Sequence, residues 1–411
     1  MRLFYNLIII IVLILSPLII FYRILKKKEN PKRFLEKFGF FRGNKKTGKL
    51  IWFHCSSVGE LLSVVPLIEK LEKEKDIKNI LLTTSTLSSS NLFKKFKFKK
   101  TFHKFYPIDN YFIVNRFLNY WKPSAVFFVE SEIWPEMLRI LKLKKIKVYL
   151  LNARISKRSF RRWKYLKKIA TNLFNSFDYI FPQSKETQKH LKYFNLRNIE
   201  FLGNLKFSET EKKNINKPLP KIFLNRNIFC AASTHNNEEE IISNIHLELN
   251  KKIKNLLTII IPRHTERSRE ILEIFIKKKL NYICHSQKKK IKDSTNIYLV
   301  DTYGESKTFY AVSNLVFLGG SLVPKGGQNP LEPIRYGCRI IQGKHTFNFV
   351  EIYKMLIKKG LSFEAKNISQ LKKLINKLIL EKKSNKKEVN SFKKIGNNIL
   401  KRNFNKIRDL I

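Results

Sequence analysis

The chain has 411 residues, with 82 Lys and Arg against 32 Asp and Glu, which gives a formal net charge of +50. Hydrophobic residues make up 43% of it and only four residues are Cys, so a disordered tail protein and a disulfide scaffold are both excluded. The length suits two domains, or three at most, each large enough for its own core.

The charge has two interpretations. A strongly basic chain suggests a polyanionic partner, such as nucleic acid, a membrane surface or a phosphorylated substrate. Lys, Asn, Ile and Phe are abundant, however, whereas Gly and Pro occur only 14 and 13 times, as expected when nucleotide composition drifts toward A and T. Because the Lys residues are spread along the chain and no nucleic-acid-binding motif occurs, we take drift as the larger cause and expect no nucleic-acid partner.

The first element is an uncharged apolar segment, residues 3–22. At about 1.5 Å per residue it is long enough to cross a hydrocarbon core of roughly 30 Å. Arg23 and Lys26 to Lys28 follow it, while Arg2 alone precedes it, so the positive-inside rule puts the rest of the chain in the cytoplasm. A cleaved signal peptide fits less well, since the apolar segment is too long and no small-x-small site follows. We therefore predict a membrane anchor helix over residues 1–25.

Short apolar runs then alternate with amphipathic segments. In the first half the predicted strands are residues 50–54, 80–84, 125–129, 148–152, 179–181 and 199–202, with a helix over 60–73. In the second half they are residues 228–232, 256–261, 297–300, 315–318 and 339–342, with a helix that includes 238–242. Such alternation predicts parallel, doubly wound α/β sheets.

The pattern restarts after a Lys-rich stretch, residues 205–222, that contains Pro218 and Pro220. We therefore predict two Rossmann-like domains, at 26–208 and 209–385. The last segment, 386–411, is expected to be a helix, with a return to the first domain as one possible path. Two such domains facing across a cleft would hold a ligand at the carboxyl ends of their strands.

Acidic residues follow two strands of the first domain. Glu60 is expected in the first turn of the helix after the first strand, where it is either a general base or a complement to the helix dipole. Glu130 and Glu132 follow the strand at 125–129, where they are either functional or an ordinary acidic helix start ahead of Pro135. Both alternatives stay open for each site.

The second domain carries basic and glycine-rich strand ends. Arg263 and Arg267 follow the strand at 256–261 and could hold a phosphate between them. Four of the chain's 14 glycines, at positions 319, 320, 326 and 327, fall in one loop, whose backbone N–H groups would suit a phosphate or ribose. The helix start at Pro330 follows, and Glu332 could accept from ribose hydroxyls. No Walker motif, G-x-G-x-x-G or metal-type His/Cys spacing occurs.

These motifs resemble, in order, those of bacterial 3-deoxy-D-manno-octulosonic acid (Kdo) transferases. The residues that carry the resemblance are 56–60, 130–135, 152–156, 203–207, 233–235, 262–264, 304–305, 319–321 and 329–333. The resemblance covers essentially the whole chain. It implies an inverting GT-B glycosyltransferase with no metal or other cofactor.

The resemblance also implies substrates and roles. Kdo would move from CMP-Kdo to the lipid A precursor lipid IVA in lipopolysaccharide core biosynthesis. The enzyme would sit at the cell inner membrane, in contact with its lipids and with its catalytic domains on the cytoplasmic face. Glu60 would be the catalytic base, and Glu130 and Lys206 would stabilise the transition state. The residues expected to hold CMP are Pro262, Arg263, Tyr303, Gly304, Glu305, Asn329, Pro330, Leu331 and Glu332.

Some positions depart from the family pattern. Cys55 stands where Ala is usual, Gln328 where His is usual, Asn236 and Asn237 where Glu and Gly are usual, and Lys344 where Pro is usual. Gln328 leaves open whether the glycine-rich loop contacts CMP as in other members of the family.

Two other functions remain as alternatives: a GT-B enzyme with a different nucleotide sugar, and a basic protein that binds nucleic acid or anionic lipid. The candidates for the acceptor-binding surface are Lys26 to Lys28, Lys45, Lys46 and the region from Lys94 to Lys104.

Overall fold

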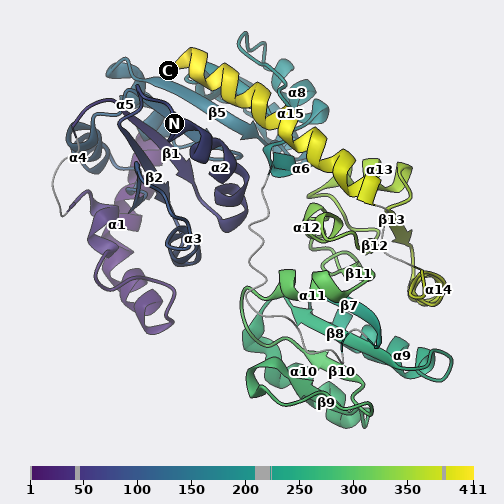
Figure 1. Ribbon diagram of the computed structural model, residues 1–411. Helices are drawn as coiled ribbons and strands as arrows, with labels where there is room; N and C mark the ends of the chain where they lie inside the picture. Colours follow the sequence, from purple (N-terminus) through teal and green to yellow (C-terminus); the bar gives the residue numbers. More distant parts are fainter. Residues whose placement is uncertain (1, 42–46, 209–222, 224, 382–385) are drawn as a thin grey trace. The chain divides into compact units, whose positions relative to one another are not determined.

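Parallel strands form two sheets, each in a separate unit of the chain, in the computed structural model (Figure 1). The structure describes residues 2–41, 47–208, 223, 225–381 and 386–411. Unit 1 comprises residues 1–210 and 395–411, and unit 2 comprises residues 211–394. Most of the predicted boundary stretch (209–222) lies outside the described residues, and so do Lys45 and Lys46 of the predicted acceptor surface.

The sheet of unit 1 has six parallel strands in the order β3-β2-β1-β4-β5-β6. They are β1 (Leu50–Cys55), β2 (Asn79–Thr84), β3 (Thr101–Phe105), β4 (Ala125–Val129), β5 (Lys147–Ala153) and β6 (Tyr179–Pro182). The strand order reverses between β1 and β4. In doubly wound sheets a ligand binds beyond the carboxyl ends of the strands at such a reversal.

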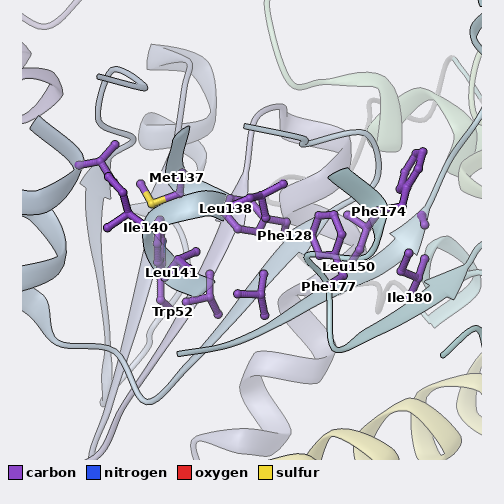
Figure 2. Packing of buried hydrophobic residues seen from close by; sticks show 14 of the residues in the cluster. Trp52, Phe128, Met137, Leu138, Ile140, Leu141, Leu150, Phe174, Phe177 and Ile180 are labelled. Atoms are coloured by element: carbon purple, nitrogen blue, oxygen red, sulfur yellow. The ribbon is translucent and has the colours of Figure 1, made fainter. Parts of the chain in front are cut away.

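Helices cover both faces of this sheet because successive strand residues point to opposite sides. Trp52 packs in one core cluster, shown in Figure 2, and Phe53 packs in the other. The helices are α2 (Val58–Leu71), α3 (Leu87–Phe93), α4 (Tyr111–Trp121), α5 (Pro135–Leu143), α6 (Lys157–Tyr165), α7 (Lys167–Phe174) and α8 (Lys185–Lys192), with short 3-10 turns η1 (Phe34–Phe38) and η2 (Leu205–Ser208). Residues of α4, α5, α7 and α8 join the cluster of Trp52, and residues of α2 join that of Phe53.

The last helix, α15 (Lys386–Leu410), leaves unit 2 and enters unit 1 at Ile395. Leu400 and Ile407 are buried in the same cluster as Phe53. The unit 1 core is therefore closed by residues from the end of the chain.

The sheet of unit 2 has seven parallel strands in the order β13-β12-β11-β7-β8-β10-β9. They are β7 (Asn227–Thr234), β8 (Leu256–Pro262), β9 (Tyr282–Cys284), β10 (Ile297–Leu299), β11 (Leu315–Leu318), β12 (Arg339–Gly343) and β13 (Ser362–Ala365). The helices are α9 (Glu238–Leu249), α10 (Ser268–Lys277), α11 (Ser306–Val312), α12 (Leu331–Arg335), α13 (Val350–Lys358) and α14 (Ile368–Leu378). Here the strand order reverses between β7 and β11.

The predicted class, two parallel α/β domains, is confirmed. The strand predicted at 199–202 is wrong, because only Ile199 pairs there, in a single bridge with Ile180. Three strands that were not predicted, β3, β9 and β13, all lie at sheet edges.

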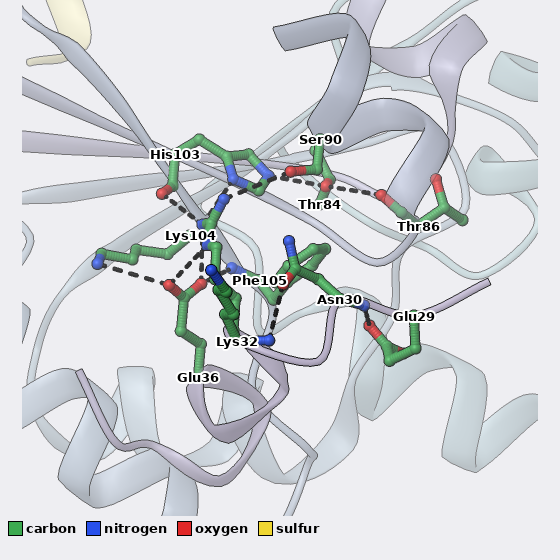
Figure 3. A network of polar contacts seen from close by, with 11 residues as sticks. Glu29, Asn30, Lys32, Glu36, Thr84, Thr86, Ser90, His103, Lys104 and Phe105 are labelled. Atoms are coloured by element: carbon green, nitrogen blue, oxygen red, sulfur yellow. Dashed lines mark hydrogen bonds and ion pairs between the residues drawn. The ribbon is translucent and has the colours of Figure 1, made fainter. Parts of the chain in front are cut away.

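A polar network ties the segment before β1 to the edge strand β3 (Figure 3). Arg33 donates to both carboxylate oxygens of Glu36, from Nε and Nη2, each at 2.9 Å. Glu36 also accepts the N–H of Phe105 at 2.8 Å, and Arg33 donates to the carbonyl of His103 at 2.9 Å. These contacts cover the open edge of β3 and fix η1 against it.

The N-terminal helix α1 (Arg2–Leu25) contains the predicted apolar segment, and Pro17 lies inside it. Residues Phe4–Leu25 reach a mean hydropathy of 2.8, and among the described helices this is the one long and apolar enough to cross a membrane. The finding is compatible with the predicted anchor by length and composition.

Candidate functional site

Glu60 lies at the carboxyl end of β1, in the first turn of α2. Its carboxylate accepts the N–H of Ser56 at 2.7 Å and the hydroxyl of Ser57 at 2.9 Å. Ser57 is the N-cap of α2 and in return accepts the N–H of Glu60 at 3.3 Å. This reciprocal pair resembles a capping box, except that the backbone N–H bound by Glu60 belongs to Ser56, one residue before the N-cap, so Glu60 does support the start of its helix.

The pKa of Glu60 indicates a role beyond capping the helix. Burial raises its pKa to about 7, the charges of Glu130 and Glu132 also raise it, and both outweigh the hydrogen bonds from Ser56 and Ser57. A carboxylate that served only as a cap would have a lowered pKa, because its hydrogen bonds favour the charged form. A pKa near the working pH is what a general base needs.

Glu130 and Lys206 form an ion pair beside Glu60, with 2.6 Å between Lys206 Nζ and Glu130 Oε1 and both side chains largely buried. Glu130 comes directly after β4, and Lys206 comes from η2. Glu130 has a φ of +62°, in the left-handed region where a side chain is strained, and such strain is often found at functional sites. The three predicted catalytic residues therefore lie together at the strand reversal of unit 1.

His54 and Glu132 form a second pair here, and His54 was not among the predicted site residues. His54 Nε2 lies 3.1 Å from Glu132 Oε2, and Trp134 Nε1 donates to the same oxygen at 2.8 Å. Burial would raise the pKa of Glu132, but the hydrogen bonds from His54 and Trp134 lower it below its ordinary value. Glu132 therefore stays ionised beside Glu60. His54 could have been identified from the sequence, because it is a polar residue within the otherwise apolar run 50–54.

In unit 2, five of the nine residues predicted to hold CMP line one pocket of about 90 Å³. Pro262 and Arg263 come from the end of β8, and Tyr303, Gly304 and Glu305 follow the neighbouring strand β10. The Arg263 side chain is exposed, so its guanidinium is open to an anionic ligand.

One buried polar atom without a partner lines this pocket, and two more belong to the residues that follow its Ser233. Among the described residues the hydroxyls of Thr234 and Thr302 and Nε2 of His235 have no hydrogen-bond partner. Thr302 lines the pocket, as does Ser233, the neighbour of Thr234. Burial, helped by His264 and Arg263, lowers the pKa of His235 to about 4, so its ring is neutral. Buried polar groups are nearly always satisfied, so these atoms indicate a place for a polar ligand.

Arg267 does not join Arg263 in a phosphate clamp. Its guanidinium lies 2.9 Å from the buried carboxylate of Glu239 and 3.2 Å from Glu270. An arginine paired in this way with a buried carboxylate is not free to leave it without a large cost. The predicted pairing of Arg263 with Arg267 around a phosphate is therefore wrong.

The glycine-rich loop is also used differently from the prediction. The backbone N–H groups of Gly320, Ser321 and Leu322 donate to the buried carboxylate of Glu238 at 2.7, 3.2 and 3.1 Å. For these three amides the predicted phosphate or ribose contact is wrong, because a side chain already satisfies them. A Cβ on Gly319 would lie 2.4 Å from the carbonyl oxygen of Ser233, so this glycine lets β11 end close against β7.

The other four predicted CMP residues, Asn329 to Glu332, lie at the start of α12 and do not line the pocket. Asn329 Oδ1 accepts the N–H of Leu331 at 3.1 Å, and Leu331 is buried. The carboxylate of Glu332 lies 4.0 Å from Nζ of Lys307 on α11. The first residue of α11, Ser306, does line the pocket, so α12 starts near its rim.

Known proteins resemble this chain over most of its length. Residues 32–209 match the family model described as 3-deoxy-D-manno-octulosonic-acid transferase (kdotransferase). The 3-deoxy-D-manno-octulosonic acid transferase of Haemophilus influenzae is 33% identical over 360 residues, 84% of each chain. That of Rickettsia bellii is 31% identical over 389 residues, 94% of this chain and 92% of the relative. A crystal structure of UDP-GlcNAc 2-epimerase from Neisseria meningitidis superimposes with a TM-score of 0.57 over 86% of this chain and 96% of that one. At 14% identity the last likeness shows the fold alone.

Proposed function

The chain belongs to the 3-deoxy-D-manno-octulosonic acid transferase family and is a glycosyltransferase of Kdo, and from that premise we propose that it moves Kdo from CMP-Kdo to lipid IVA. The transfer inverts the anomeric centre, and Glu60 is the general base. The enzyme works at the cell inner membrane, with both units on the cytoplasmic face.

The observation that carries the proposal is the raised pKa of Glu60 at the strand reversal. As the acceptor hydroxyl attacks the anomeric carbon of Kdo, its proton passes to the Glu60 carboxylate. The new C–O bond forms while the bond from the anomeric carbon to the CMP phosphate oxygen breaks, and that oxygen keeps the electron pair. One displacement from the side opposite the leaving group inverts the centre.

Glu130 and Lys206 support this step electrostatically. The anomeric carbon gains positive charge in the transition state, which a fixed carboxylate favours. Lys206 neutralises Glu130 when no substrate is bound, since the two groups are 2.6 Å apart. We propose that the transfer needs no metal, with Arg263 offsetting the charge of the departing CMP phosphate.

The unpartnered hydroxyls of Thr234 and Thr302 support nucleotide binding in unit 2. A nucleoside monophosphate offers ribose hydroxyls and phosphate oxygens that can satisfy such groups. Thr302 lines the pocket at the ends of β8 and β10, and Thr234 directly follows Ser233, which lines it too. The donor would thus be held by unit 2, and the base belongs to unit 1.

The proposed reaction is tested by incubating the full chain with CMP-Kdo and lipid IVA in EDTA. We expect Kdo-lipid product and released CMP, identified by mass spectrometry, and competition for binding by CMP but not by UDP. No product, or equal product from wild type and Glu60→Ala, would contradict the assignment. Product that disappears only in EDTA would contradict the metal-free step.

The pH profile should report the environment of Glu60. Because a base must be deprotonated, kcat/KM is expected to rise with pH through about 7. Glu132→Gln removes a charge that raises the pKa of Glu60, so the rise should move to lower pH. Asp76→Asn makes the same charge change at an exposed site of unit 1 and should leave the profile in place. If the pH profile of Glu132→Gln is unchanged or moves to higher pH, the charge of Glu132 does not raise the pKa of Glu60.

Arg263→Ala should weaken CMP binding by about 10- to 100-fold, since a hydrogen bond to a charged group contributes about 1.5–3 kcal/mol. Isothermal titration with CMP measures the change. Arg269→Ala removes an exposed arginine of α10 and serves as the matched control, for which we expect an unchanged Kd. Equal affinities for the two variants would remove Arg263 from the nucleotide site.

A further inference from the structure

The N-terminal end of α1 is bonded to the interior of unit 1. Tyr5 donates its hydroxyl hydrogen to Asp109 Oδ2 at 2.6 Å. Asp109 is only 2% exposed, and its carboxylate also accepts the N–H groups of Glu136 and Met137 at 3.0 and 2.7 Å. Asp109 is therefore a fixed part of unit 1, and Tyr5 reaches it.

The other end of α1 is bonded to the same unit. Arg23 Nε lies 3.2 Å from Glu29 Oε2, and the buried Glu29 is held in turn by Lys37 Nζ at 2.5 Å. Between the two ends, Ser16 and Ile20 are buried. In Figure 1 the start of α1 likewise lies among elements of unit 1. The helix is thus docked along its length.

These contacts are incompatible with a helix that crosses a bilayer. Tyr5 and Arg23 are separated by roughly 27 Å along the axis, at about 1.5 Å per residue. A hydrocarbon core is roughly 30 Å thick, so a crossing helix would put its two ends at opposite faces. Asp109 and Glu29 belong to one unit, which lies on one side. Both contacts can exist together only if α1 runs beside unit 1.

The outward face of α1 is nevertheless apolar. The side chains more than half exposed lie mostly three, four or seven residues apart: Phe4, Leu7, Ile14, Leu18, Phe21, Tyr22 and Leu25. This spacing forms one stripe along a helix. An uncovered stripe of this size marks an interaction with a membrane or a partner.

The surroundings of the stripe favour a lipid surface. Phe112, 77% exposed at the start of α4, follows Asp109 by three residues, so an exposed aromatic stands beside the Tyr5 end. At the other end Arg23 is followed by the exposed Lys26, Lys27 and Lys28. Aromatic and basic residues that flank an apolar helix face are typical of helices that lie in the membrane interface and contact anionic headgroups.

We propose that α1 does not span the membrane but lies in the plane of its interface, docked on unit 1, with the apolar stripe toward an anionic bilayer surface. Both ends of α1 then lie on the cytoplasmic side. Phe112 on unit 1 contacts the same surface, so the body of the enzyme rests on the leaflet.

The location of the N-terminus tests this arrangement. One variant carries a short tag with a single cysteine before Met1, and the other carries Lys28→Cys. The four native cysteines are buried and give little background. In inner-membrane vesicles with the cytoplasmic face outward, an impermeant maleimide should label both positions equally without detergent. A tag that reacts only after detergent is added would show a crossing helix and overturn the proposal.

Binding to vesicles tests the surface itself. Phe112→Asp should lower the partition coefficient of the protein onto phosphatidylcholine–phosphatidylglycerol vesicles by about 10- to 150-fold, which corresponds to the roughly 1.5–3 kcal/mol of a buried Phe side chain. Phe347→Asp changes a similarly exposed Phe of unit 2 and should have no effect. A crossing helix would bind regardless of Phe112, so an unchanged Phe112→Asp, or equal loss in both variants, overturns the proposal.

Discussion

Replacing Glu60 with Gln is expected to lower kcat by about 100- to 10,000-fold, the range that a general base contributes. The amide has nearly the size of the carboxylate and keeps one oxygen to accept a hydrogen bond, but it cannot take a proton at neutral pH. Rates are measured with CMP-Kdo and lipid IVA, and the Kd for CMP, bound by unit 2, should stay within about twofold.

A matched variant separates the two roles of Glu60. Ser57→Ala removes the N-cap hydroxyl that pairs with Glu60 but leaves the carboxylate, and should cost about 1 kcal/mol of stability. If the cap were all that mattered, Ser57→Ala and Glu60→Gln would lower the rate alike. A Glu60→Gln enzyme that turns over at the wild-type rate, or that folds but no longer binds CMP, would contradict the role of base.

Glu238→Ala is expected to destabilise unit 2 by about 3 kcal/mol or more. Its buried carboxylate accepts four backbone N–H groups, from His235 at 2.9 Å and from Gly320, Ser321 and Leu322. Removing it leaves four donors without partners, two of them buried, and each buried donor costs about 1–3 kcal/mol unless water replaces the lost acceptor.

The sequence offers a direct comparison for Glu238. Glu240→Ala, two residues along α9, removes an exposed Glu whose partner is Lys278 and should cost less than about 1 kcal/mol. All four Trp residues lie in unit 1, at positions 52, 121, 134 and 163. Far-ultraviolet circular dichroism should therefore show an earlier unfolding transition for Glu238→Ala, while Trp fluorescence should not. Equal stability of the two variants would mean that the four amides find other acceptors.

The buried strands were predictable because their apolar runs are continuous. Strands β4 and β11 begin and end where the sequence predicts, at 125–129 and 315–318. The missed strands are edge strands, which are half covered and so lack such runs. In β3, exposure alternates and Lys104 interrupts the pattern, while β9 has three residues and β13 four. An edge strand is defined by its neighbour, which a single sequence does not display.

The site residues, too, were predictable only where a local sequence pattern marks them. An acidic residue directly after a buried strand pointed to Glu130, because a carboxylate there is costly without a use. Glu60 was found by its place in the first turn of the helix after β1, a pattern that left a base and a dipole partner as alternatives. Lys206 came from the resemblance, since no local pattern joins it to Glu130, 76 positions earlier. Glu238 was missed because it stands in a run of three Glu at a helix start, where all three look like dipole partners. Only the approach of β11 to β7 gives Glu238 the three amides of Gly320, Ser321 and Leu322 in addition to the local one of His235.

The entry of α15 into unit 1 has a consequence during synthesis. Unit 1 needs residues 395–411, but the ribosome makes the whole of unit 2 first. At about 5–20 residues per second that takes about 10 to 40 s. During this interval the first sheet of the nascent chain lacks Leu400 and Ile407, so apolar surface around Phe53 is left uncovered and open to aggregation or chaperone binding. Unit 2, made from one continuous segment, can finish folding first, so the order of translation is the reverse of the order of completion.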